Sequence, residues 1–221
     1  MQWNLPNILT VIRLLAAPGV AVMFLYFHRP WADWFALTLF VGAAITDWFD
    51  GYLARLWHQE SKFGAAMDPI ADKAMVVIAI MVLTGYSGMN PWLILPATVI
   101  LFREVFVSGL REFLGNNAST LKVTKLAKWK TTAQMVAIAV LFLGTGLDYL
   151  NGVAMQGMTP DEYVNAVSAG LADPVRACGK RDCASLVGYL GLVLMWVAAI
   201  LTAFTGLDYF RKSQRYLKED A

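Results

Sequence analysis

The chain has 221 residues, of which 58% are hydrophobic and only 15% are charged. Soluble domains carry about 25% charged residues, so this composition excludes an ordinary soluble globular protein and indicates a polytopic membrane protein. The net charge of +2 says little by itself, and no nucleic-acid partner is expected. The length fits a single membrane domain over residues 1–221.

Six apolar segments are long enough to cross a bilayer, which takes about 20 residues in a helix. They cover residues 7–27, 33–56, 68–87, 91–114, 124–147 and 185–208. We therefore predict an all-α protein with six transmembrane helices. The first segment is expected to be retained, because no basic region or small-residue cleavage site of a signal peptide accompanies it.

Lysine and arginine are distributed unevenly around these segments. One set of ends holds Arg55, Lys62, Arg111, Lys122, Lys125, Lys128, Lys130, Arg211, Lys212, Arg215 and Lys218. The opposite loops hold only Arg29, Arg176, Lys180 and Arg181. Because basic residues favour the cytoplasmic side, we expect both termini in the cytoplasm of a bacterium, with the chain in its inner membrane.

A longer segment, residues 148–184, is then expected outside. Its sequence Thr159-Pro160-Asp161-Glu162 is a capping box with proline at the first helical position, which predicts a short helix. Cys178 and Cys183 are either a disulfide, as an oxidising face would allow, or two free thiols. The role of this segment is open.

Four aspartates lie in the apolar part of the chain. Asp47 and Asp50 share one helix face, and Asp68 and Asp72, four residues apart, share another. An ionised carboxylate near the bilayer centre costs about 2.5–3.5 kcal/mol, so a cationic ligand is expected. Two facing helices with two carboxylates each form an all-oxygen site suited to Mg²⁺ or Mn²⁺. The charge distribution puts this site in the cytoplasmic half of the helix bundle.

The alternative is that these aspartates cap helices or pair with Arg55, Lys62 and Lys73. That explanation suits any single aspartate. It does not explain why four of them are interleaved with small residues, which allow a backbone to approach a large ligand closely. The small residues are Gly51, Ala54 and Gly64.

The pattern Asp47-x2-Asp50-Gly51-x2-Ala54-Arg55-x8-Gly64-x3-Asp68-x3-Asp72 resembles the signature of the CDP-alcohol phosphotransferase family at every position. The resemblance implies an integral membrane enzyme that moves a phosphatidyl or similar group from a CDP-linked donor to an alcohol and releases CMP. It also implies a homodimer.

The resemblance assigns roles within this pattern. Asp47, Asp50 and Asp68 would be the main ligands of two divalent ions, and Asp72 would share a metal and act as general base. The donor, CDP-diacylglycerol, would be held through its cytidine nucleotide by Gly51, Ala54, Arg55 and Gly64. Arg55 has the planar fork of donors that suits a diphosphate, although it could instead be a charged anchor at a helix end.

Further basic residues near the cytoplasmic ends of other segments suggest an acceptor that carries a phosphate. They are Arg103, Arg111, Lys128 and Lys130, and we expect them to converge near the acidic site. Asn7 and Arg13 stand in the first segment; Arg13 either contacts phosphate or pairs with an aspartate.

Flanking motifs resemble the bacterial branch of the family whose acceptor is sn-glycerol 3-phosphate, over about residues 3–145. These motifs are Leu-Pro-Asn-Ile-Leu-Thr-x-x-Arg at the start, Arg103-Glu104, Leu110-Arg111-Glu112 and Lys128-x-Lys130-Thr-Thr-Ala-Gln. Inositol phosphate, serine or phosphatidylglycerol are the alternative acceptors within the family. The distant alternative is an ion-binding membrane transporter.

Overall fold

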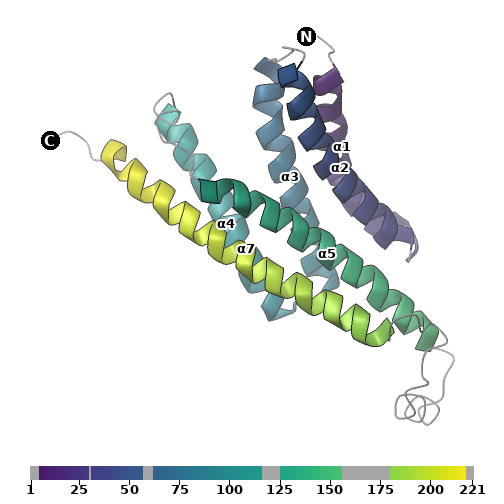
Figure 1. The fold of residues 1–221 in the computed structure, drawn as a ribbon. Coiled ribbons are helices and arrows are strands. Elements are labelled where there is room, and N and C mark those ends of the chain that lie inside the picture. The colour runs from purple at the N-terminus through teal and green to yellow at the C-terminus, as the bar shows by residue number, and fades with distance from the viewer. Residues whose placement is uncertain (1–4, 30, 57–61, 116–124, 156–179, 218–221) are drawn as a thin grey trace. The chain divides into compact units, whose positions relative to one another are not determined.

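The computed structural model describes residues 5–29, 31–56, 62–115, 125–155 and 180–217, and within them it contains helices and no strand. The all-α prediction is confirmed. The helices in chain order are α1 (Leu5–Tyr26), α2 (Trp31–Leu56), α3 (Lys62–Tyr86), α4 (Pro91–Leu114), α5 (Lys125–Met155) and α7 (Lys180–Leu217), as labelled in Figure 1.

Four of these helices are long and apolar enough to cross a membrane. The qualifying stretches are Asn7–Tyr26 in α1, Pro91–Leu114 in α4, Trp129–Leu150 in α5 and Leu186–Tyr216 in α7. The chain is therefore a membrane protein by the length and composition of its helices. The aspartate-bearing helices α2 and α3 are not among the four, so their membrane crossing stays a prediction.

Helices α5 and α7 both extend into the segment predicted to lie outside the membrane, residues 148–184. Helix α5 continues to Met155, and α7 already begins at Lys180. Apolar composition marks where a helix can cross a membrane, whereas backbone hydrogen bonding continues through polar residues such as Asp148. The predicted helix from Thr159 and Cys178 lie outside the described residues, as does the side chain of Cys183, so the disulfide stays untested.

The chain divides into two compact units, and α3, α5 and α7 each contribute to both. Unit 1 comprises residues 1–79 and 139–191. Figure 1 shows α1, α2 and α3 side by side in this unit. Its apolar centre includes Phe142 of α5, whose ring centroid lies 5.9 Å from that of Phe24 on α1 and 5.8 Å from that of Phe40 on α2.

Glycines set the separation of α5 and α7 in unit 1. A Cβ added to Gly144 would lie 3.3 Å from the Gly188 Cα, which is closer than most real Cβ contacts. A Cβ added to Gly191 would lie 2.8 Å from Leu141 Cδ2. The two helices therefore approach backbone to backbone, as small residues permit in membrane helices.

At the end of unit 1 away from Asp47, Asp68 and Asp72, an ion pair holds neighbouring helices together. Arg29 donates hydrogen bonds from Nε to Asp33 Oδ2 at 2.7 Å and from Nη2 to the Thr145 carbonyl at 2.9 Å. Its guanidinium carbon also lies 4.7 Å from the centre of the Tyr149 ring. Since Asp33 is only 1% exposed, this bidentate pair neutralises a buried charge and joins α2 to α5.

Unit 2 comprises residues 80–138 and 192–221. Its helix α4 starts after Asn90, whose side chain accepts a hydrogen bond from the Trp92 amide at 3.0 Å, with Pro91 at the first helical position. The helix ends at Gly115, whose φ of +49° suits glycine. These caps fix both ends of the helix that carries Arg103, Glu104 and Arg111.

Helices α4 and α7 pack side by side in unit 2. The Trp196 indole nitrogen donates to the Trp92 carbonyl at 3.0 Å, and the rings of Phe106 and Phe210 lie 5.6 Å apart. Because residue numbers rise together along the two helices, α4 and α7 run in the same direction. The buried side chains of Val107, Leu114 and Tyr209 pack together on this contact.

Candidate active site

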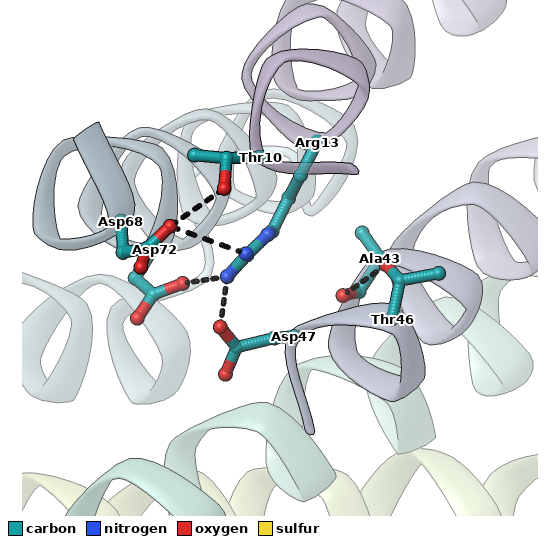
Figure 2. Close-up of polar contacts among 7 residues, drawn as sticks. All are labelled: Thr10, Arg13, Ala43, Thr46, Asp47, Asp68 and Asp72. Carbon is teal, nitrogen blue, oxygen red and sulfur yellow. Dashed lines mark hydrogen bonds and ion pairs between the residues drawn. The ribbon is translucent and has the colours of Figure 1, made fainter. Parts of the chain in front are cut away.

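Three of the four predicted acidic residues surround one arginine in unit 1. Figure 2 shows Asp47 of α2 and Asp68 and Asp72 of α3 pointing toward the Arg13 side chain of α1. Arg13 Nη1 donates to Asp47 and, at 2.7 Å, to Asp72 Oδ1, and Nη2 lies 3.7 Å from Asp68 Oδ1. The structure thus brings Asp47, Asp68 and Asp72 together, as the sequence predicted.

Burial is uneven across this acidic cluster. The Arg13 side chain is 0% exposed, whereas those of Asp47, Asp68 and Asp72 are 40%, 44% and 36% exposed. The guanidinium is therefore the inner layer of the cluster and the carboxylates form its outer layer. The three carboxylate side chains therefore remain partly accessible to a ligand.

Sequence reasoning missed one member of the site, Thr10. Its hydroxyl donates to Asp68 Oδ1 at 2.7 Å, and its side chain is buried. Asn7, Thr10 and Arg13 follow one another at three-residue spacing and are all buried, so they form one polar face of α1. This spacing was the available signal. Of the two alternatives for Arg13, the structure shows the pairing with aspartates, and a phosphate contact for Asn7 or Arg13 stays a prediction.

The proposed nucleotide-binding residues are placed only in part. Gly64 is buried on α3, four residues before Asp68. Gly51, Ala54 and Arg55 follow Asp47 on the α2 backbone. The side chains of Asp50, Ala54 and Arg55 lie outside the described residues. The helical backbone keeps Asp50 three residues after Asp47 on the same side of α2.

The predicted basic residues lie in unit 2, where two of them share a carboxylate. The Lys130 amine of α5 binds Glu104 Oε1, and Arg103 Nη1 of α4 lies 3.2 Å from the same oxygen. Arg111 lies apart from this pair contact, with its guanidinium carbon 5.6 Å from the centre of the Tyr209 ring on α7. The Lys128 side chain lies outside the described residues. The convergence of these residues with the aspartates stays a prediction.

Comparison with known families gives a match to the CDP-alcohol phosphatidyltransferase model over residues 3–207. The match covers helices α1 to α5 and α7 as far as residue 207, and it includes every residue of the acidic cluster. The chain belongs to the CDP-alcohol phosphatidyltransferase family.

Curated relatives within the family are similar along their whole length. A protein from Cereibacter sphaeroides named CDP-diacylglycerol–glycerol-3-phosphate 3-phosphatidyltransferase is 76% identical over 220 residues, covering 100% of both chains. Proteins with the same name from Salmonella choleraesuis and Shigella flexneri serotype 5b are 36% and 35% identical over 211 residues, or 95% of this chain and 94% of theirs.

CDP-alcohol phosphatidyltransferases are generally dependent on divalent metal ions. Among the described residues no group of three His, Cys, Asp or Glu side chains is arranged to hold a metal ion as it stands. The donor set nevertheless fits one. Asp47, Asp68 and Asp72 offer only carboxylate oxygens, and they already converge on one cationic group, Arg13.

Replacing Arg13 with methionine is expected to destabilise the protein most when no divalent ion is present. The change leaves three neighbouring carboxylates without their buried counter-ion. Breaking a fully buried ion pair costs about 3–5 kcal/mol, and we expect less here because the carboxylates are 36–44% exposed. The measurement is the thermal unfolding temperature in detergent, with EDTA and with Mn²⁺.

Arg211, an exposed residue of α7, provides a matched control as Arg211→Met. An equal loss of stability with EDTA and with Mn²⁺ would show that Arg13 does not balance the carboxylates electrostatically.

Proposed function

We propose that this chain transfers phosphatidyl from CDP-diacylglycerol to the sn-1 hydroxyl of sn-glycerol 3-phosphate, giving phosphatidylglycerol phosphate and CMP. The observation that carries the proposal is the 76% identity, along the whole chain, to a relative named for that reaction. The acidic cluster of unit 1 suits metal ions that would bind the diphosphate of the donor. The basic cluster of unit 2, which we define as Arg103, Arg111, Lys128 and Lys130, suits the phosphate of the acceptor. The family match also favours an enzyme over an ion transporter.

The reaction forms one bond to phosphorus and breaks another. The acceptor hydroxyl oxygen attacks the phosphorus that carries diacylglycerol, and the bridging P–O bond of the diphosphate breaks, so that its electron pair leaves with CMP. Asp72 takes the hydroxyl proton as general base. Its placement on α3, one turn after Asp68, puts this base beside the proposed metal ligands.

Asp47, Asp50 and Asp68 would hold Mg²⁺ or Mn²⁺, two ions per site, with Asp72 sharing one. When bound, the ions would neutralise charge on the diphosphate oxygens and orient the donor. Gly51, Ala54, Arg55 and Gly64 would cradle the cytidine nucleotide. Gly64 has no side chain, which would let a ligand approach its backbone closely.

We further propose six transmembrane helices, with both termini cytoplasmic, in the bacterial inner membrane. The uneven distribution of lysine and arginine supports this orientation. The common direction of α4 and α7, which follows from the Trp92–Trp196 and Phe106–Phe210 contacts, agrees with a single crossing by α5 between them. A homodimer is proposed from the family resemblance.

The metal-ligand assignment predicts that Asp47→Asn, Asp50→Asn or Asp68→Asn abolishes activity, because an amide supplies neither the charge nor the second oxygen of a carboxylate. CMP release from CDP-diacylglycerol and glycerol 3-phosphate is the measurement. EDTA should abolish it in the native protein and added Mn²⁺ should restore it. Asp148→Asn, an exposed carboxylate of α5, should keep native activity, and full turnover in EDTA would contradict the assignment.

The general-base assignment predicts a different result for Asp72→Asn. The amide can still touch a metal but cannot accept a proton, so CDP-diacylglycerol binding should survive while CMP release falls at least about a hundredfold. Donor binding by calorimetry and CMP release in single turnover separate the two effects. Near-native turnover would remove Asp72 from this role.

The acceptor assignment predicts that Arg103→Gln, Arg111→Gln, Lys128→Gln and Lys130→Gln each raise the KM for glycerol 3-phosphate. Loss of one charged hydrogen-bonding partner costs about 1.5–3 kcal/mol, or roughly ten- to a hundredfold. The KM for CDP-diacylglycerol should change much less, and Arg211→Gln serves as control. Lys130→Arg should recover part of the loss, because it keeps the contact with Glu104.

A panel of acceptors tests the substrate itself. CMP release should be fast with glycerol 3-phosphate and slow with glycerol, serine, phosphatidylglycerol and inositol phosphate. Both inositol phosphate and glycerol 3-phosphate carry a phosphate that the basic cluster could bind. Faster CMP release with inositol phosphate would therefore identify it as the acceptor in place of glycerol 3-phosphate.

A further inference from the structure

Unit 2 contains buried polar atoms that have no hydrogen-bond partner. They are Arg103 Nε, Gln134 Nε2, Thr202 Oγ1 and Tyr209 Oη. Gln134, Thr202 and Tyr209 are 2%, 0% and 8% exposed. Such atoms are uncommon in folded proteins, because an unpaired buried polar group carries the full penalty of its desolvation. Each of the four can donate a hydrogen bond.

One close contact and the helical spacing relate these atoms to Arg103 and Lys130. Gly206 of α7 lies directly against Arg103, and a Cβ added there would be 2.8 Å from Arg103 Cγ. Thr202, Gly206 and Tyr209 stand at i, i+4 and i+7, so they share one face of α7. Gln134 is one turn after Lys130 on α5, on the side that faces Glu104.

The charge of this cluster points to its ligand. Arg103 and Lys130 both contact one carboxylate, Glu104. Arg111 adds a third cation through its position over the Tyr209 ring. Acceptor oxygens of a ligand would satisfy the four unpaired donors and lie close to these cations. A phosphate supplies several such oxygens together with negative charge.

We propose that Thr202 and Tyr209 of α7, together with Gln134 of α5, complete the binding site for the phosphate of the acceptor alcohol. This proposal rests on the function proposed above and extends the acceptor site to helix α7. Gly206 acts as a positioning residue, because its lack of a side chain lets Arg103 lie against α7. The hydroxyl groups and the amide then select a phosphate-bearing acceptor over an uncharged one.

Tyr209→Phe and Thr202→Val test the proposal, since each removes a hydroxyl and keeps nearly the same volume. Each should raise the KM for glycerol 3-phosphate about tenfold, the loss expected for one hydrogen bond to a charged group. The KM for CDP-diacylglycerol, and kcat at saturating glycerol 3-phosphate, should stay within about twofold of native. Gly206→Ala, which displaces Arg103, should show the same selective rise.

Matched controls exist on the same helix. Thr205 is buried like Thr202, but its hydroxyl already donates to the carbonyls of its own helix, Leu201 at 2.9 Å and Thr202 at 3.0 Å. Thr205→Val should therefore leave the acceptor KM unchanged. Tyr189→Phe, at an exposed tyrosine of α7, is the control for Tyr209.

Binding of inorganic phosphate separates this proposal from the proposed function. Phosphate should raise the thermal unfolding temperature of the native protein and of the controls, and raise it less in Tyr209→Phe and Thr202→Val. If glycerol 3-phosphate is not the acceptor but this difference holds, the proposed function falls and the phosphate site stands. If acceptor KM and phosphate stabilisation are native in both variants, or if donor and acceptor KM rise equally, the α7 site is overturned.

Discussion

The contact of one buried guanidinium with three carboxylates holds the acidic end of unit 1 together. Four uncompensated carboxylates in a bilayer would cost roughly 10–14 kcal/mol, and the helices that carry them would repel each other. Arg13 reaches Asp47 on α2 and both Asp68 and Asp72 on α3. Its planar fork has five donors, so a single side chain from α1 can bridge two neighbouring helices, orient their carboxylates and offset part of their negative charge.

In unit 2 the described polar contacts gather around a carboxylate instead of an arginine. One carboxylate, Glu104, serves both Arg103 and Lys130, and nearby donors lack acceptors. Surplus negative charge favours cations, whereas surplus donors favour anions with several oxygens. The proposed reaction, between a diphosphate donor and a phosphorylated alcohol, has a substrate for each kind of group. The low dielectric of a membrane helix bundle strengthens this selectivity, since each unmatched group is expensive there.

Much of this arrangement could be predicted from the sequence, because it depends on local spacing. The apolar stretches gave the order of the helices, and the four-residue interval between Asp68 and Asp72 placed both on one face of α3. The apolar pattern does not predict where α5 and α7 end, because these helices extend beyond the apolar stretch into polar sequence.

Contacts between distant helices were harder to predict. Thr10 gave a weak signal through its spacing from Arg13, but its partner Asp68 is 58 residues away. Tyr209 and Thr202 look like ordinary residues of a spanning helix in the sequence. Only the packing of α7 on α4 shows that Gly206 lies against Arg103 and that the tyrosine hydroxyl is buried without a partner.

The close approach of Gly144 and Gly188 limits how this fold can change over evolution. The atoms that a new methyl group would meet at position 144 belong to the backbone of α7, so no change of rotamer can make room for it. A larger residue at position 144 would force α5 and α7 apart, which would also separate Leu141 from Gly191. Substitutions at this crossing are therefore expected to covary among relatives, whereas exposed positions such as Leu190 and Val193 can change independently.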